Sequence, residues 1–261
     1  MNDIDMITLV FVYVDDLFKA IKLDPKTGPN GTLTESEIVT IMIMHPILKP
    51  YWDLKSYYKW VINNLSSLFP DMPDYTRITR LFLSNRELVL VVMKSLCNQN
   101  SFGLIADGTC IPVMERVRGK YAKSFRDARF VYSASKKEWY WGFLLILVLD
   151  QEGKIAFLNI GIQAEVKQLE TICEDLSNRW VLSDLGFIGK DLHERLWKDN
   201  QIKIKITGGK ERQWIENVIG FLKDKLGLDQ IRKIRKTPSL LARIYSMLCA
   251  YNLIQSLVLA N

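Results

Sequence analysis

The pattern of apolar residues changes near residue 100, and this change constrains the fold more than any other feature of the sequence. Beyond it, short apolar runs of strand length alternate with amphipathic segments of helical length. Strands are expected at residues 102–107, 140–150, 155–163, 180–184 and 202–206, and helices at residues 168–177, 191–198 and 212–223. Three strands followed by alternating helices and strands are typical of a mixed α/β sheet.

The first 98 residues carry a different pattern, in which apolar residues recur at helical spacing between turn and capping residues. Helices are expected at residues 5–22, 34–44, 49–68, 75–84 and 86–97, the second of them ending at His45-Pro46. We therefore predict an all-helical N-terminal domain over residues 1–98 and an α/β domain over residues 99–261. The second domain is expected to end in a buried helix from residue 239.

Positive charge is concentrated in two segments of the chain. Residues 114–137 carry eight Lys or Arg against two acids, and residues 203–243 carry eleven against four, whereas the whole chain has a formal net charge of +6. The remainder is therefore net acidic. Local positive charge of this kind favours an anionic partner such as nucleic acid, although an ordinary solvated surface has the same composition.

Two carboxylates, Asp107 and Asp184, stand at the ends of strand-like runs. In an open α/β sheet, ligands bind outside the carboxyl ends of neighbouring strands, so we expect these two side chains to lie together. A third acid, Glu216, lies in the amphipathic helix 212–223 between two cations. Three such acids could hold two Mg²⁺ ions, which bind carboxylate oxygens and substrate phosphates and need neither His nor Cys. The alternatives are turn or capping roles for the two Asp residues and a surface ion pair for Glu216.

Several short motifs accompany these acids. The helix 212–223 carries the spacing Arg-x3-Glu-x6-Lys through Arg212, Glu216 and Lys223. The other motifs are Leu33–Ile38, Phe69–Tyr75, Ile105–Thr109, Trp141–Phe143 and Ser183–Phe187. In this order they resemble the DDE transposases of bacterial insertion sequences. The resemblance implies an RNase H-like mixed five-stranded sheet with flanking helices, preceded by the helical domain.

The resemblance also implies an activity. Asp107, Asp184 and Glu216 would be catalytic and would bind two Mg²⁺ ions, for which Mn²⁺ can substitute. In the family reaction, water frees a 3′-hydroxyl at the transposon end, and that hydroxyl then attacks target DNA. The residues expected to contact DNA are Arg212, Lys223, Arg116, Arg118, Lys120, Arg235 and Lys236.

The implied partner is double-stranded DNA, both transposon ends and target, bound by a homodimer in the bacterial cytoplasm at the nucleoid. The helical N-terminal domain would bind the DNA end or mediate dimerisation. Neither zinc nor disulfides are expected, because the four cysteines form no CxxC pair. The apolar stretch 239–261 contains Arg243, Asn252 and Gln255, so a buried helix is expected there and no membrane span.

Three departures from the family pattern leave other functions open. Gly209 stands where relatives usually have Tyr, and Leu185-Gly186 stands where they often have Lys-Gly. On the second strand, Gly142–Ile146 lacks the Lys and His that relatives often carry. The alternatives are therefore a catalytically weak or inactive transposase-derived protein that only binds DNA, or another RNase H-like nuclease.

Overall fold

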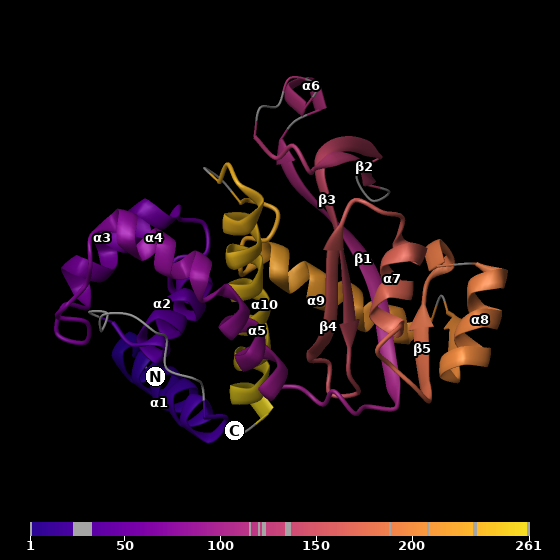
Figure 1. Cartoon of the computed structure of the whole chain (residues 1–261), viewed down its shortest axis with the longest axis horizontal. Helices are drawn as coiled ribbons and strands as arrows, with labels where there is room; N and C mark the ends of the chain where they lie inside the picture. The colour runs from indigo at the N-terminus through magenta and orange to yellow at the C-terminus, as the bar shows by residue number, and fades with distance from the viewer. Residues whose placement is uncertain are drawn as a thin grey trace. The chain divides into compact units, whose positions relative to one another are not determined.

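The computed structural model describes residues 2–22, 33–114, 116–119, 121, 124–133, 137–187, 189–207, 209–231 and 234–259 (Figure 1). Its helices are α1 (Asp3–Ala20), α2 (Glu35–Leu48), α3 (Leu54–Asn64), α4 (Tyr75–Ser84), α5 (Arg86–Ser95), α6 (Arg116–Gly119), α7 (Glu165–Cys173), α8 (Lys190–Asn200), α9 (Lys210–Asp224) and α10 (Thr237–Leu259), with a 3-10 turn, η1 (Leu185–Phe187). Its strands are β1 (Gly103–Met114), β2 (Arg129–Ser133), β3 (Glu138–Leu149), β4 (Ile155–Gly161), β5 (Arg179–Ser183) and β6 (Ile202–Ile206).

The chain divides into two compact units. The first unit combines residues 1–93 with residues 225–254, and the second comprises residues 94–224 and 255–261. Most of α10 thus belongs with the N-terminal helices, whereas the sequence analysis placed it in the α/β domain. The sequence does not show which elements the C-terminal helix packs against. Its position after the last strand therefore favoured the α/β domain.

Side-chain caps and buried apolar residues fix the helices of the first unit. Thr34 caps α2 by accepting from the Glu37 N–H, while the Glu37 carboxylate accepts from the Thr34 N–H at 2.7 Å. The expected end of this helix at His45-Pro46 is wrong, because α2 continues to Leu48. Nearly every residue from Ser36 to Pro46 is buried, and this packing offsets the hydrogen bond that a proline removes.

Polar contacts tie α10 to the other helices of the first unit. Asn252 is fully buried and donates to the carbonyl of Met93 at 3.2 Å, and Arg243 donates to the carbonyl of Pro50 at 2.6 Å. Buried apolar residues such as Ile244 and Met247 line the helix between these two contacts. No helix in the described part of the chain is long and apolar enough to cross a membrane.

A mixed six-stranded sheet forms the centre of the second unit. The strand order is β2-β3-β1-β5-β6, and β4 pairs with β3 on the same side as β2. β1 runs antiparallel to β3 and parallel to β5, and β6 is parallel to β5. α7 and α8 bury Leu169, Ile172 and Leu192 against one face of this sheet, and α9 contacts β1 and β5.

The expectation of five strands is corrected by β2, which pairs with the first half of β3. Its sequence, Arg-Phe-Val-Tyr-Ser, lies inside the basic segment 114–137, and the side chains of Arg129, Phe130 and Tyr132 are exposed. Two cross-strand aromatic pairs hold it: Phe130 with Trp141 and Tyr132 with Trp139, with ring centroids 5.0 and 5.3 Å apart. These pairs depend on a register that the isolated segment does not reveal.

Candidate active site

Asp107 and Asp184 lie at the edge where β1 and β5 separate. The parallel pairing of the two strands ends at Ile105 and Leu182, so each Asp follows the last paired residue of its strand by two positions. The prediction that a strand ends at Asp107 is wrong, since β1 continues to Met114 along β3. The acid nevertheless stands where β1 loses its parallel neighbour, which brings the two carboxylates to one edge of the sheet.

The Asp107 carboxylate is largely buried and is bound by the backbone N–H of the residue that follows it in β1. The N–H of Gly108 donates to one carboxylate oxygen of Asp107 at 2.7 Å. Burial, together with the nearby charge of Asp184, raises the pKa of Asp107 to about 6 although the Gly108 hydrogen bond and Arg212 act to lower it. Just after β5, the N–H of Gly186 in η1 donates to Oδ1 of Asp184 at 2.8 Å, which holds that carboxylate against η1.

The helix α9 supplies Arg212 and Glu216 to the same region. Its apolar face, with Ile215, Val218 and Leu222, is buried, so the polar face turns toward the sheet edge. Nη2 of Arg212 lies 3.6 Å from Oδ2 of Asp184, and Nε lies 2.9 Å from Oε1 of Glu216. The structure thus places Arg212 between Asp184 and Glu216, and the charges of all three act on Asp107. Their catalytic role stays a prediction.

A fourth carboxylate, Glu165, belongs to this group and was not singled out from the sequence. It opens α7, just after β4. Burial and the charges of Asp184 and Asp107 raise its pKa to about 7, and Arg212 opposes the rise. The sequence carries no signal for it, because its neighbours Gly108 and Gly186, where a Cβ would collide with the Glu165 carboxylate, are brought to it only by the fold.

These carboxylates offer only oxygen donors, the chemistry that Mg²⁺ and Mn²⁺ prefer. In the part of the chain that the structure describes, however, no three His, Cys, Asp or Glu side chains are gathered closely enough to hold a metal ion. The guanidinium of Arg212 pairs with Asp184 and Glu216 instead. The donor set fits a divalent cation, and binding would require Arg212 to move aside.

The other residues of the second unit that were predicted to contact DNA are Lys223, Arg118, Arg116 and Lys120. Lys223 is two turns beyond Glu216 on α9, roughly 10 Å along the helix axis. Arg118 is exposed on the short helix α6. Arg116 lies on the same helix, but its side chain is outside the described residues, and so is Lys120.

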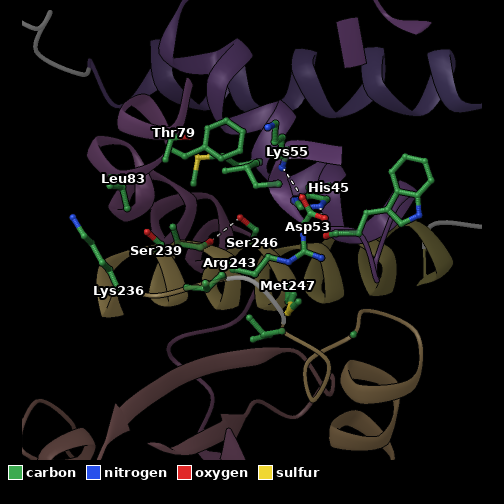
Figure 2. A pocket seen from close by; sticks show the side chains of 18 of the residues that line it. His45, Asp53, Lys55, Thr79, Leu83, Lys236, Ser239, Arg243, Ser246 and Met247 are labelled. Carbon is green, nitrogen blue, oxygen red and sulfur yellow. Dashed lines mark hydrogen bonds between the residues drawn. The ribbon is translucent and has the colours of Figure 1, made fainter. Parts of the chain in front are cut away.

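Arg235 and Lys236 belong to the first unit, where they line a cavity of about 680 Å³ (Figure 2). Apolar and aromatic residues form much of its wall, including Tyr51, Trp52 and Tyr75. Its charged lining residues are Asp53, Lys55, Arg80, Arg235, Lys236 and Arg243. The cavity therefore combines aromatic surface with an excess of positive charge.

Arg243 on α10 is the most buried cation of this cavity. Its Nη2 donates to the Pro50 carbonyl, while its Nη1 is buried without a hydrogen-bond partner among the described residues. Burial lowers the pKa of Arg243 to about 9. Nearby, burial and the Arg243 charge hold the pKa of His45 well below its usual range, and Nε2 of His45 contacts the carbonyl of Trp52 at 3.1 Å.

Comparison with known proteins agrees with this geometry. The model of a family described as a transposase DDE domain matches residues 94–237, more than half of the chain. The matched range contains Asp107, Glu165, Asp184 and Glu216. No curated protein matches the sequence significantly. The chain belongs to the transposase DDE domain family.

Proposed function

We propose that this protein is a DNA transposase of an insertion sequence, with an RNase H-like catalytic core. The strand order supports this fold assignment, because β1, β3 and β4 form a series in which each strand is antiparallel to the next, and β5 and β6 then run parallel to β1. The extra strand β2 pairs only with the start of β3 and leaves that order intact. The family match over residues 94–237 supports the activity.

The observation that carries the proposal is the convergence of Asp107, Asp184 and Glu216 around one guanidinium at the carboxyl edge of the sheet. Structural ion pairs do not need three acids from two strands and a helix. A two-metal phosphoryl-transfer site uses such acids to bind its cations, because its charged transition state is stabilised mainly by bound cations and positioned charges.

In the proposed reaction, the three carboxylates would hold two divalent cations, Mg²⁺ or Mn²⁺. Bound there, the cations would activate the attacking water or 3′-hydroxyl and stabilise the leaving oxygen. Arg212 would exchange its ion pairs for a phosphate of the transposon end, a bidentate partner of similar geometry. Lys223, further along α9, would contact the DNA backbone beyond the reacting phosphate.

The first, helical unit would bind the DNA end. Its cavity exposes Arg80, Arg235 and Lys236, and cations at such a surface release counterions when they meet phosphates. We propose a homodimer on double-stranded DNA, with one protomer for each transposon end. Arg118 and the rest of the basic segment 114–137 would contact the DNA backbone in the same complex.

The test uses a duplex carrying the terminal repeat that flanks the gene, incubated with Mg²⁺ or Mn²⁺ and a supercoiled plasmid target. We expect nicking at the repeat and joining of its 3′ end to the plasmid, both lost in Asp184→Asn. Glu194→Gln, an acid on α8 away from the carboxylate group, should behave like the natural protein. Cleavage without joining would replace the transposase with a nuclease.

One observation favours a second function, a transposase-derived protein that only binds DNA. Arg212 pairs with Asp184 and Glu216, and no three carboxylates among the described residues lie close enough together to hold a metal ion as they stand. In that case the terminal-repeat duplex would be bound equally by the natural protein and Asp184→Asn. Neither would cut it at any metal concentration.

A further inference from the structure

We propose that Glu165 is a fourth carboxylate of the divalent-cation site, contributed by the first turn of α7. This inference rests on the proposed function, because it adds one ligand to the same site. It also explains why two glycines accompany the two aspartates, at Gly108 on β1 and Gly186 in η1.

The backbone around the site is shaped to admit this side chain. A Cβ added to Gly108 would lie 2.6 Å from Oε1 of Glu165, and one added to Gly186 would overlap Oε2. The same Cβ at Gly186 would lie 3.0 Å from Oδ1 of Asp184. The Glu165 carboxylate therefore occupies a slot between the segments that carry Asp107 and Asp184.

A purely structural role for Glu165 explains this position poorly. An acid in the first turn of a helix favours the positive end of the helix dipole, but it gains that benefit equally while facing solvent. Among the described residues, none donates a hydrogen bond to the Glu165 carboxylate, and the nearest charges include the two aspartates. Like charges this close repel unless a cation or a proton lies between them.

Calorimetric titration of Mn²⁺ into the DNA-free full-length protein tests the inference. We expect Glu165→Gln to weaken Mn²⁺ affinity at least tenfold. The control is Glu174→Gln, which removes an exposed carboxylate at the other end of α7 and should leave the affinity unchanged. Urea unfolding without metal should find Glu165→Gln at least as stable as the natural protein, because Gln removes a buried negative charge, and this excludes misfolding as the cause.

The outcomes separate this inference from the proposed function. If Asp184→Asn abolishes Mn²⁺ binding while Glu165→Gln binds normally, the role of Glu165 is overturned and the three-carboxylate site stands. If the natural protein binds no Mn²⁺ and cuts no DNA, both fall. A loss of metal affinity in Glu165→Gln that is matched by Glu174→Gln would be a general charge effect and would also overturn the assignment.

An independent observation, the cavity of the first unit, carries a second inference. We infer that this cavity binds an unpaired nucleotide of a DNA strand, with its base against the aromatic wall and its phosphate at the cationic rim. Five cations line the cavity against one acid, and Asp53 already accepts the N–H groups of Lys55 and Ser56 as the cap of α3. An anionic occupant is therefore favoured.

The walls and size suit a nucleotide. Tyr51 and Trp52 are nearly half exposed at the cavity, so their rings offer surface on which a base can stack. The volume lies within the range of about 300–1,000 Å³ that is common for small-molecule sites. At the back of the cavity, Arg243 carries the unpartnered Nη1, which an anion could reach after a small shift of the side chain.

Fluorescence anisotropy with a labelled single-stranded oligothymidine tests this site. We expect Trp52→Ala to weaken binding about tenfold. Arg80→Ala should weaken binding and reduce the slope of log affinity against log salt by about 0.7, the loss of one phosphate contact. The control is Arg77→Ala, an exposed cation one turn earlier on α4 that does not line the cavity.

Equal effects of Arg77→Ala and Arg80→Ala would indicate general electrostatics and overturn the assignment. So would tighter binding of a fully paired duplex of the same length that is insensitive to Trp52→Ala. Complete competition by free thymidine monophosphate at micromolar concentration would reassign the cavity to a free nucleotide and overturn the role of a DNA strand.

Discussion

Nε of Arg212 lies 2.9 Å from Oε1 of Glu216, one turn further along α9, yet the two atoms do not align as a hydrogen bond. The second contact of this guanidinium, with Asp184, is longer at 3.6 Å. Arg212 is thus held among the carboxylates by charge more than by directed bonds. A metal ion can therefore displace Arg212 from the carboxylates without breaking a well-aligned hydrogen bond. Such an ion pair suits a site that binds and releases metal ions.

Removing this cation should strengthen metal binding in the absence of DNA. Arg212→Met leaves the carboxylates of Asp184 and Glu216 without a competing charge, so we expect Mn²⁺ to bind several-fold more tightly by calorimetry. Cleavage of a transposon end should nevertheless be lost, because the phosphate loses its partner. In the control, Arg195→Met, the ion pair with Glu170 is removed and the metal affinity should not change. Weaker Mn²⁺ binding in Arg212→Met would contradict the competition.

The pH dependence of stability follows from the two raised pKa values. Asp107 and Glu165 have pKa values of about 6 and 7 in the folded protein, above the values near 4 of unfolded chains. Between about pH 4 and 7 the folded state therefore binds more protons than the unfolded state, and these groups make the metal-free protein less stable as pH rises.

We expect the double variant Asp107→Asn, Glu165→Gln to flatten this pH slope in urea unfolding of the metal-free protein. Saturating Mn²⁺ should reverse the sign for the natural protein, since a cation binds the deprotonated carboxylates and then stabilises the folded state increasingly with pH. An identical slope in the natural protein and the double variant would refute the raised pKa values.

The close approach of Gly108 to the Glu165 carboxylate predicts that substitutions at these two positions have non-additive effects on Mn²⁺ affinity. Gly108→Ala should push the Glu165 carboxylate away from the site and weaken Mn²⁺ binding, because its Cβ meets Oε1 at 2.6 Å. In a Glu165→Ala background the same substitution has no carboxylate to displace, so its additional effect on Mn²⁺ affinity should be small. A double-mutant cycle measures this coupling, and additive effects would place the collision elsewhere, for example at Ile146.

The sequence predicted what depends on local pattern. Strands β5 and β6 and helices α4 and α9 lie close to their expected positions, and Asp184, just after β5, lies within ion-pair distance of Arg212 on α9. These elements are short and periodic, and their capping and turn residues are local. The two aspartates could be placed together because the carboxyl ends of parallel strands share one sheet edge.

What the sequence did not predict depends on partners far along the chain. Strand β2 forms because its aromatic residues meet those of β3, and α10 joins the first unit through contacts such as Asn252 with Met93. Glu165 is an ordinary first-turn acid until β1 and η1 close around it. In each case the deciding neighbour is distant in sequence, so no local pattern carries the information.

One such long-range contact gives a last prediction about folding. Asp150, fully buried at the end of β3, accepts hydrogen bonds from the N–H groups of Asn98 at 2.8 Å and of Glu152 and Lys154 at 2.9 Å. It thereby closes the β3–β4 turn and anchors the segment that leads into β1. Each bond to a charged acceptor contributes about 1.5–3 kcal/mol, and the bonds are not independent.

We therefore expect Asp150→Ala to lower the free energy of unfolding by about 3–5 kcal/mol, measured by urea denaturation. Glu152→Ala, two residues on and exposed at the same turn, removes only a surface ion pair with Lys154 and should cost less than about 1 kcal/mol. Asp150→Asn keeps one acceptor oxygen and should fall between the two. If Asp150→Ala proved as mild as Glu152→Ala, Asp150 would not be the anchor of this turn.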